Sequence, residues 1–458
     1  MKRIFFCVFI LLFLQLCYSC KKFLTVKVPE NRLTNPMVFA NDSTATAALV
    51  GIYAAMSSQR LNFPSGDQSI TLLTGLNADE LDNYSGMSEI KEFYANDISP
   101  TNTINWNIWR QLYVSIYQCN SVLEGLNTSS MITPLLKQQL LGEALFLRAF
   151  FYFYLVNLYG QVPLALTTSY QVNNVLSRSP IPNVYCQIKN DLISARTLLS
   201  DEYISGTERI RANRYAASAL LARVYLYCHQ WEQTVVNASL VINCTNKYHL
   251  CDQLTDVFLK NSPEVILQLQ PSLPKYNTFD AEIFILNTVP TLVACSRQLQ
   301  TAFEPTDKRQ AAWMGSVKIL DDRFYFPYKY KVQVGADVQE YLMLLRLGEL
   351  YLVRAEAYAH LGLIDSALAD LNIIRERAST PPFDAISVDS ILNAIYMERQ
   401  VELFSEWGHR WFDLKRTLRA DEVLNDLKFP GWNTLDTLYP IPQSEIALNP
   451  HLTQNVGY

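Results

Sequence analysis

Apolar residues recur at steps of three and four through most of this chain, and that period predicts a mostly α-helical protein. Residues 43–56 are rich in alanine and follow Asn41 and Asp42, which are good helix N-cap residues. Residues 141–159 form a long apolar run that ends at Gly160. A further helix is predicted from one stripe of side chains: Trp109, Tyr113, Ile116, Asn120 and Leu123.

Two later segments repeat one another. The segment ALLARVYLYCHQWEQTVVNASLVI and the segment LYLVRAEAYAHLGLIDSALADLNII share one order of small and large side chains around a central turn. This layout is typical of a tetratricopeptide helix pair, in which a small residue lets the second helix pack closely. The matched positions are Ala222, Tyr225, Trp231 and Ala238 in the first copy, and Ala355, Tyr358, Ile364 and Leu371 in the second.

Residues 148–152 begin in a similar way, and residues 395–411 are predicted to form the first helix of a further unit. Each helix pair buries its apolar face only against its neighbours, so a stack of about four units is expected. We therefore predict one domain from residue 20 to 458, with helical scaffold at about 40–250 and 341–425. A loop-rich insertion with short strands is expected at about 251–340, where VILQLQ alternates like a strand, and an extended tail at 426–458.

The N-terminus has the pattern of a secretory signal. Lys2 and Arg3 precede eleven apolar residues, far fewer than the roughly 20 that cross a bilayer. Cleavage after Ser19 would remove residues 1–19 and leave Cys20 as the new N-terminus, the pattern of a bacterial lipoprotein. We therefore predict lipidation of Cys20 and a membrane anchor; the alternative is an ordinary secreted protein cut elsewhere. Cys17 then leaves with the signal, so its spacing from Cys20 is not a redox motif.

Charge and motifs exclude several functions. The chain carries 38 Lys and Arg against 43 Asp and Glu, whereas a nucleic-acid partner would require a basic face. We find no HExxH, Gly-x-Ser-x-Gly or P-loop motif, and the five histidines show no ligand spacing. No catalytic residue, metal or cofactor is expected. Six cysteines follow Cys20, and the sequence leaves open whether Cys244 and Cys251 pair.

Two acidic groups are candidate sites. Glu398 and Glu402 lie four residues apart on one predicted helix, which favours an ion-pair network with Arg399 and Arg410 over a glycosidase pair facing across a substrate. The acidic cluster at residues 79–82 could bind calcium, but a solvated loop is the simpler interpretation.

Five segments together resemble the SusD/RagB family of outer-membrane nutrient-binding lipoproteins. They are CKKFLTVKVPE, EALFLRAFFYFYLVNLYGQVPL, RLGELYLVRAEAYAHLG, ERQVELFSEWGHRWFDLKR and LYPIPQSEIALNPHLTQNVGY. The resemblance implies tetratricopeptide-like helix pairs with a loop-rich face. It also implies a surface lipoprotein of the outer membrane that hands oligosaccharides, or in some members peptides, to a SusC-like TonB-dependent transporter. Lys22, Thr25 and Val456 depart from the residues that the family usually carries.

The resemblance and the aromatic content together suggest ligand residues, because sugar rings stack on flat aromatic surfaces. Trp106 and Asn107 lie in NTINWN, just before the predicted start of a helix, where the family places part of its ligand site. Trp313 lies in the insertion, Tyr84 in the polar loop DNYSG, and Trp432 in FPGWN, where it could instead anchor a turn. For each ring the competing interpretation is burial in a loop core.

Three functions remain open on the sequence. The first is a glycan-binding or peptide-binding surface lipoprotein that partners a transporter. The second is an interaction scaffold without a small-molecule ligand, since tetratricopeptide stacks often bind only proteins. An enzyme is the third, and the missing carboxylate arrangement argues against it.

Overall fold

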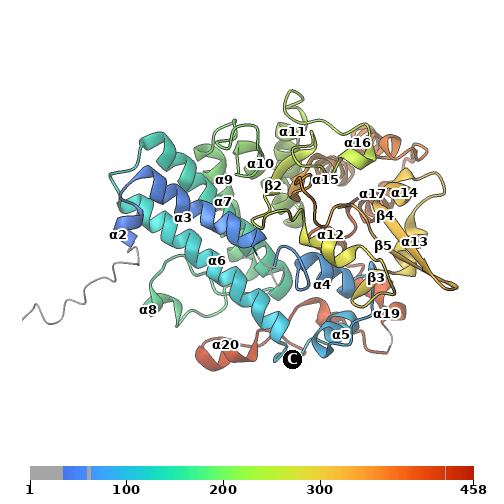
Figure 1. Cartoon of the computed structure of the whole chain (residues 1–458), viewed down its shortest axis with the longest axis horizontal. Helices are drawn as coiled ribbons and strands as arrows, with labels where there is room; N and C mark the ends of the chain where they lie inside the picture. The colour runs from blue at the N-terminus through green and yellow to red at the C-terminus, as the bar shows by residue number, and fades with distance from the viewer. Residues whose placement is uncertain (1–34, 59–62, 429) are drawn as a thin grey trace, which may run out of the picture.

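The helices form one continuous row in which each element packs on the next. The computed structural model describes residues 35–58, 63–428 and 430–458, so the predicted signal and Cys20 lie outside the described residues. Figure 1 shows the row running from the blue and cyan helices through green to orange. In packing order it comprises α3 (Asp42–Ser57), α6 (Thr103–Thr128), α7 (Pro134–Tyr159), α9 (Ile181–Leu198), α10 (Arg214–Tyr227), α11 (Trp231–Ile242), α15 (Leu347–His360), α16 (Ile364–Arg377) and α17 (Val388–Leu403).

The predicted repeats are antiparallel helix pairs, α10 with α11 and α15 with α16, which confirms the mostly helical, tetratricopeptide-like fold class. Their small positions Ala222 and Ala355 are completely buried, as close helix packing requires. The two pairs meet where Trp231 stacks on His360, with ring centroids 4.0 Å apart and planes 9° apart. The repeat signature therefore also forms the interface between units.

Shorter elements fill one side of the row. Within the described residues the strands form three two-stranded antiparallel sheets, in which β1 pairs with β3, β2 with β6, and β4 with β5. The strands are β1 (Leu81–Asn83), β2 (Val265–Leu269), β3 (Val293–Cys295), β4 (Met314–Ile319), β5 (Asp322–Pro327) and β6 (Leu342–Arg346). The short helices are α2 (Asn35–Val38), α4 (Ile70–Asn77), α5 (Ser88–Ala95), α8 (Tyr170–Asn173), α12 (Phe279–Phe284), α13 (Arg297–Ala302), α14 (Lys308–Trp313), α18 (His409–Arg416), α19 (Ala420–Leu427), α20 (Gln443–Leu448), and the 3-10 turns η2 (Leu254–Asp256) and η3 (Thr434–Thr437).

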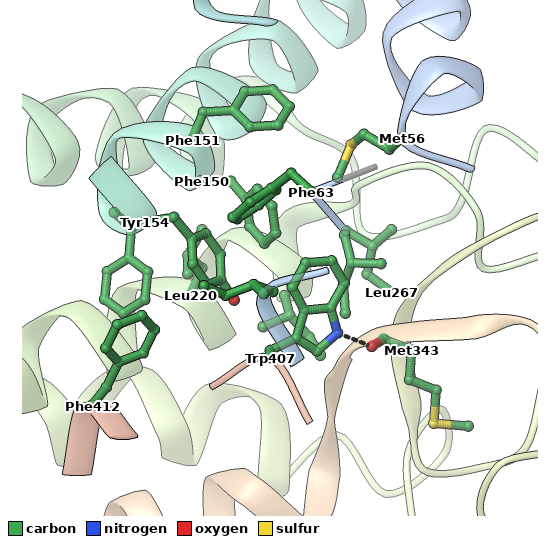
Figure 2. Close-up of a cluster of buried hydrophobic side chains, with 14 of the residues drawn as sticks. Met56, Phe63, Phe150, Phe151, Tyr154, Leu220, Leu267, Met343, Trp407 and Phe412 are labelled. Carbon is green, nitrogen blue, oxygen red and sulfur yellow. Dashed lines mark hydrogen bonds between the residues drawn. The ribbon is translucent and has the colours of Figure 1, made fainter. Parts of the chain in front are cut away.

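Helix α7 is the central core helix. It is long and apolar enough to cross a membrane, but nearly all of the relevant stretch is buried inside the protein. Figure 2 shows Phe150, Phe151 and Tyr154 of α7 packed with Phe63 and Trp407. Phe150 and Trp407 meet edge to face at 5.5 Å, and the indole N–H of Trp407 donates to the Met343 carbonyl oxygen. The apolar run predicted at residues 141–159 is thus a core helix, most of whose side chains are buried by neighbouring elements.

The predicted long helix at residues 395–411 is wrong, because the chain turns after α17 and starts again at α18. Ser405, Trp407 and Gly408 all have positive φ angles, of 50°, 48° and 78°. A Cβ at Gly408 would lie 2.8 Å from the Thr74 hydroxyl, so this turn packs directly on α4. Trp407 therefore lies in a tight turn and only Trp411 is helical, a break that the apolar periodicity does not reveal.

A cluster of buried ion pairs joins the scaffold to the insertion. Glu402 on α17 has no exposed surface, and its carboxylate oxygens lie 2.9, 2.6 and 2.5 Å from the guanidinium groups of Arg309, Arg346 and Arg377. These arginines come from α14, the end of β6 and the end of α16. The three guanidiniums hold the pKa of Glu402 well below its usual range, although burial alone would raise it.

The predicted network is therefore present, but with other arginines. Glu398 lies 2.6 Å from Arg309 and 3.0 Å from Arg375. Arg399 instead pairs with Asp413, and Arg410 with Asp79, each at 2.7 Å. Arg399 directly follows Glu398 on the helix, so these two side chains point in different directions. The Glu402 carboxylate is already surrounded by Arg309, Arg346 and Arg377.

Replacing Glu402 by glutamine should strongly destabilise the folded protein. Glu402→Gln leaves three buried guanidiniums without their shared anion, which is expected to lower the free energy of unfolding by about 3–5 kcal/mol. Denaturant titration followed by circular dichroism measures this loss. The matched control is Glu422→Gln, whose carboxylate is 67% exposed beside Arg419 and should contribute less than about 1 kcal/mol. Equal stability losses for the two variants would contradict a structural role for the cluster.

Asp280 gives the junction between α12 and residues 63–69 a pH dependence. Its carboxyl accepts a hydrogen bond from the Ser65 hydroxyl at 2.8 Å, and burial raises its pKa from 3.8 to about 7. The folded protein keeps this proton while the unfolded chain releases it, so the stabilising effect of Asp280 is complete at low pH and is lost as pH rises to about 7.

The isosteric variant Asp280→Asn removes this titration. It should gain stability relative to the wild type as pH rises from 4 to 7, by at most about 1.4 kcal/mol per pH unit. Urea unfolding of both proteins at pH 5 and pH 7.5 tests this through the difference between them, in which other titrating groups cancel. A difference that stays constant with pH would refute the proposed protonation of Asp280.

Candidate functional site

The first half of α6 presents an exposed ridge that we define by Trp106, Arg110, Val114 and Tyr117. The helix starts at Thr103 because the Asn102 side chain accepts hydrogen bonds from the amides of Ile104 and Asn105, both at 3.0 Å. Trp106 therefore lies in the first turns of α6, not in a preceding loop as predicted. Steps of four and three residues place all four side chains on one face of the helix.

Trp106 is held in place at its edge and on one side. Its indole N–H donates to a carboxylate oxygen of Glu445 at 3.2 Å, and the Arg110 guanidinium lies 5.4 Å from the ring centre. Glu445 belongs to α20, which Figure 1 shows beside the start of α6. The ring is nevertheless 38% exposed. A half-exposed and preorganised indole is the kind of surface on which a flat apolar ligand face can stack.

Asn107 lies beside a hollow of about 350 Å³ on one flank of the ridge, which we call the polar hollow. Its amide donates to the Gln68 side chain at 2.7 Å. The walls carry many groups able to bind hydroxyls, among them Asn107, Arg110, Gln111, Ser115 and Gln118, above an apolar base that includes Met56, Phe63 and Phe151. The sequence placed Trp106 and Asn107 together, and the structure shows them as neighbours with different surroundings.

Tyr84 is 43% exposed at the end of β1, away from both hollows of α6. Its ring meets Phe324 of β5 edge to face, with centroids 5.9 Å apart. Strand β3 lies between β1 and β5, so the aromatic pair rests on three strands that are far apart in the sequence. The structure therefore pairs Tyr84 with a ring of the insertion and does not place it beside Trp106.

Trp313 is completely buried, so its predicted contact with a ligand is wrong. Its indole N–H donates to the Leu254 carbonyl oxygen at 2.8 Å, and its ring meets Phe258 edge to face. The Lys329 ammonium lies 5.0 Å from the ring centre. The ring thus covers the buried ion-pair cluster, a role that only the tertiary structure could show.

Trp432 is partly exposed and holds the C-terminal region in place. Its indole N–H donates to Asp421 at 2.8 Å, and its ring meets Trp411 edge to face at 6.2 Å. Asp421 also accepts from the Thr434 hydroxyl at 2.9 Å. These contacts match the turn-anchoring alternative and place Trp432 outside both hollows of α6.

The acidic cluster at residues 79–82 is structural. Asp79 and Glu80 are buried, which corrects the prediction of a solvated loop. Asp79 pairs with Arg410, while burial and the Asp79 charge raise the pKa of Glu80 to about 8, so that the Glu80 carboxyl is mostly neutral near pH 7. Within the described residues no group of three or more His, Cys, Asp or Glu side chains could hold a metal ion. In the same part of the chain the six cysteines are free, so Cys244 and Cys251 do not pair.

A larger hollow on the other flank of the ridge was not predicted from the sequence. This groove of about 460 Å³ runs between α6, residues 163–176 and α20, and we call it the aromatic groove. Its lining includes Trp109, Tyr113, Tyr117 and Tyr170, together with Leu448 of α20. The position of Tyr117 off the buried stripe of α6 was the only clue to this groove in the sequence. Tyr170 and Leu448 come from segments that the sequence does not connect to α6.

Family models match both halves of the chain. One, described as starch-binding and associating with the outer membrane, matches residues 23–226, and one described as the SusD family matches residues 297–458. A SusD-like protein of Formosa agariphila is 25% identical, over 96% of this chain and 97% of that protein. A SusD-like protein of Bacteroides ovatus is also 25% identical, over 89% of this chain and 82% of its own.

Solved structures share the fold over nearly the whole chain. A SusD superfamily protein from Bacteroides vulgatus has a TM-score of 0.80 at 21% identity and covers 92% of this chain and 100% of its own. A laminarin-binding SusD-like protein has a TM-score of 0.77 at 26% identity, over 91% and 100%. Since the family matches together span most of the sequence and the same helix-pair fold underlies them, the chain belongs to the SusD/RagB family of glycan-binding, non-catalytic proteins associated with the outer membrane.

Proposed function

We propose that this protein is a lipid-anchored surface receptor that binds an oligosaccharide or polysaccharide and delivers it to a SusC-like TonB-dependent transporter. The observation that carries the proposal is the ridge of α6, where the half-exposed Trp106 is fixed by Glu445 next to the polar hollow at Asn107. An indole provides a stacking surface, and the neighbouring amide and guanidinium groups can bind the hydroxyls at the edge of a sugar ring. The similarity to a laminarin-binding protein supports a glycan as the ligand.

Tyr84 and Phe324 are proposed as a second contact for a long chain. Both rings are partly exposed and come from different elements, so they form a platform whose position depends on the insertion. A polysaccharide is long enough to contact Trp106 and this platform together. Its overall affinity would then exceed that of either weak contact alone. Trp313 and Trp432 are not part of the proposed site.

Binding should depend on Trp106 and Asn107. Isothermal titration against a panel that starts with laminarin should show binding in the wild type and roughly two- to tenfold weaker binding for Trp106→Ala, because an aromatic contact of this kind contributes about 0.5–1.5 kcal/mol. Asn107→Ala should weaken binding by a similar factor. Trp432→Ala is the matched control, since that partly exposed tryptophan contacts Asp421 and not the ridge. An unchanged affinity for Trp106→Ala, or absence of heat with every sugar, would refute the proposed site.

The lipid anchor gives a separate prediction. Cys20→Ala should release the mature protein from the outer-membrane fraction, because one lipidated cysteine carries the acyl chains that hold it there. Labelled antibody on intact cells would report exposure to the exterior, and mass spectrometry of the wild-type N-terminus would report acylation at Cys20. A Cys20→Ala protein that stays in the outer-membrane fraction of cells lacking the transporter would contradict the anchor, while loss only in such cells would indicate retention by the partner.

A further inference from the structure

The aromatic groove differs chemically from the polar hollow on the other side of α6. Its floor is formed by Trp109, Tyr113 and Ile116, and the groove walls are mainly aromatic and aliphatic. The ring of Trp109 lies 4.8 Å from that of Tyr113 and 4.9 Å from that of Tyr159, so the floor is tightly packed from below. Two hollows with different linings thus lie on either side of one ridge, and Arg110 and Val114 of this ridge line both of them.

The polar atoms at the floor are already engaged within the protein. The Tyr113 hydroxyl donates to the Pro163 carbonyl oxygen at 2.9 Å. The Asn120 amide donates to the Ala165 carbonyl oxygen at 2.8 Å, and its oxygen accepts from Arg148 at 2.9 Å. A ligand hydroxyl pushed against this floor would lose its water without gaining a partner, which is unfavourable. A bare sugar ring, with hydroxyls around its whole edge, is therefore poorly suited to the floor.

The rim has the opposite character. Tyr117 is 52% exposed and Tyr170 is 77% exposed, so their hydroxyls are in contact with solvent. In the wall, the Asn173 amide donates to the Thr167 carbonyl oxygen at 2.7 Å, while its buried oxygen has no hydrogen-bond partner among the described residues. The groove thus combines a closed apolar base with exposed polar groups near its opening.

We infer that the aromatic groove binds an aromatic substituent, such as a hydroxylated aryl ester or aryl ether group, attached to the glycan. A ring on the apolar base would leave no hydroxyl unpaired, and a phenolic hydroxyl at the opening could hydrogen-bond to solvent or to the exposed Tyr117 and Tyr170. The volume of about 460 Å³ is roughly three times that of the ~150 Å³ cavity known to hold benzene, which leaves room for the bond to the sugar. The claim that the aryl group is attached to a glycan rests on the proposed function, whereas the claim that the groove binds an aryl group does not.

Paired glycosides test the inference. For each common hexose, the methyl β-glycoside and the 4-hydroxyphenyl β-glycoside are titrated into the wild-type protein. The aryl member should bind about tenfold more tightly, equivalent to about 1.4 kcal/mol. This advantage should disappear in Ala165→Phe, which fills the groove, and in the double variant Tyr117→Ala with Tyr170→Ala. Val236→Ala, a control at an apolar side chain of α11 that is 51% exposed, should keep it.

The sugar-free probe methyl ferulate separates the two claims. Binding of methyl ferulate to the wild type and not to Ala165→Phe, with no heat from any methyl glycoside or from any sugar of the panel that starts with laminarin, would support the groove and refute the glycan proposal. Equal affinity for both members of each pair, or an aryl advantage that survives in Ala165→Phe, would overturn the inference. Thermal unfolding checks each variant, and if Ala165→Phe fails to fold, the exposed Tyr117 and Tyr170 positions carry the test.

Discussion

The shared carboxylate of Glu402 holds the two parts of this protein together. Isolated charges are costly to bury, by several kcal/mol each, so Arg309, Arg346 and Arg377 can lie inside the core only where an anion meets them. Each guanidinium comes from a different element, and Glu264 adds a second carboxylate beside Arg377. Insertion and scaffold therefore share a single geometry in which their charges are satisfied, and a loosely docked insertion would leave them unpaired.

This constraint also explains the role of the aromatic residues near the cluster. Trp313 and Phe258 cover Lys329 and Arg346, with cation-to-ring distances of 5.0–5.9 Å. Rings that exclude water strengthen the ion pairs beneath them, because the charges then interact at a lower effective dielectric constant. The insertion thus uses its largest side chain for stability, and among its rings the partly exposed Phe324 is the one that meets Tyr84.

The exposed face of α6 has a different origin. Its other face packs on α3 and α7, while α20 and residues 163–176 approach from the side and stop short of covering the ridge. Arg178 fixes the tail there by donating to the Thr453 and Gln454 carbonyl oxygens at 3.0 and 3.2 Å. The C-terminal segment, which the sequence suggested would be merely extended, therefore shapes one wall of the aromatic groove and orients Trp106 through Glu445. A single helix gains two flanks of different polarity because different segments approach each side.

The sequence by itself determined the helix pairs, the strand at residues 265–269 and the family, since all three follow from local periodicity or from ordered motifs. It also placed Trp106 and Asn107 on one exposed region, although it put the start of their helix too late because the Asn102 cap was missed. Only the tertiary structure decided that Trp313 is buried, that Asp79 and Glu80 are structural and that the chain turns at Gly408. It alone brought Tyr170 and Leu448 beside Tyr117. The physical reason is that burial, charge pairing and groove walls depend on residues hundreds of positions apart, whereas periodicity reports only which side of its own helix a residue occupies.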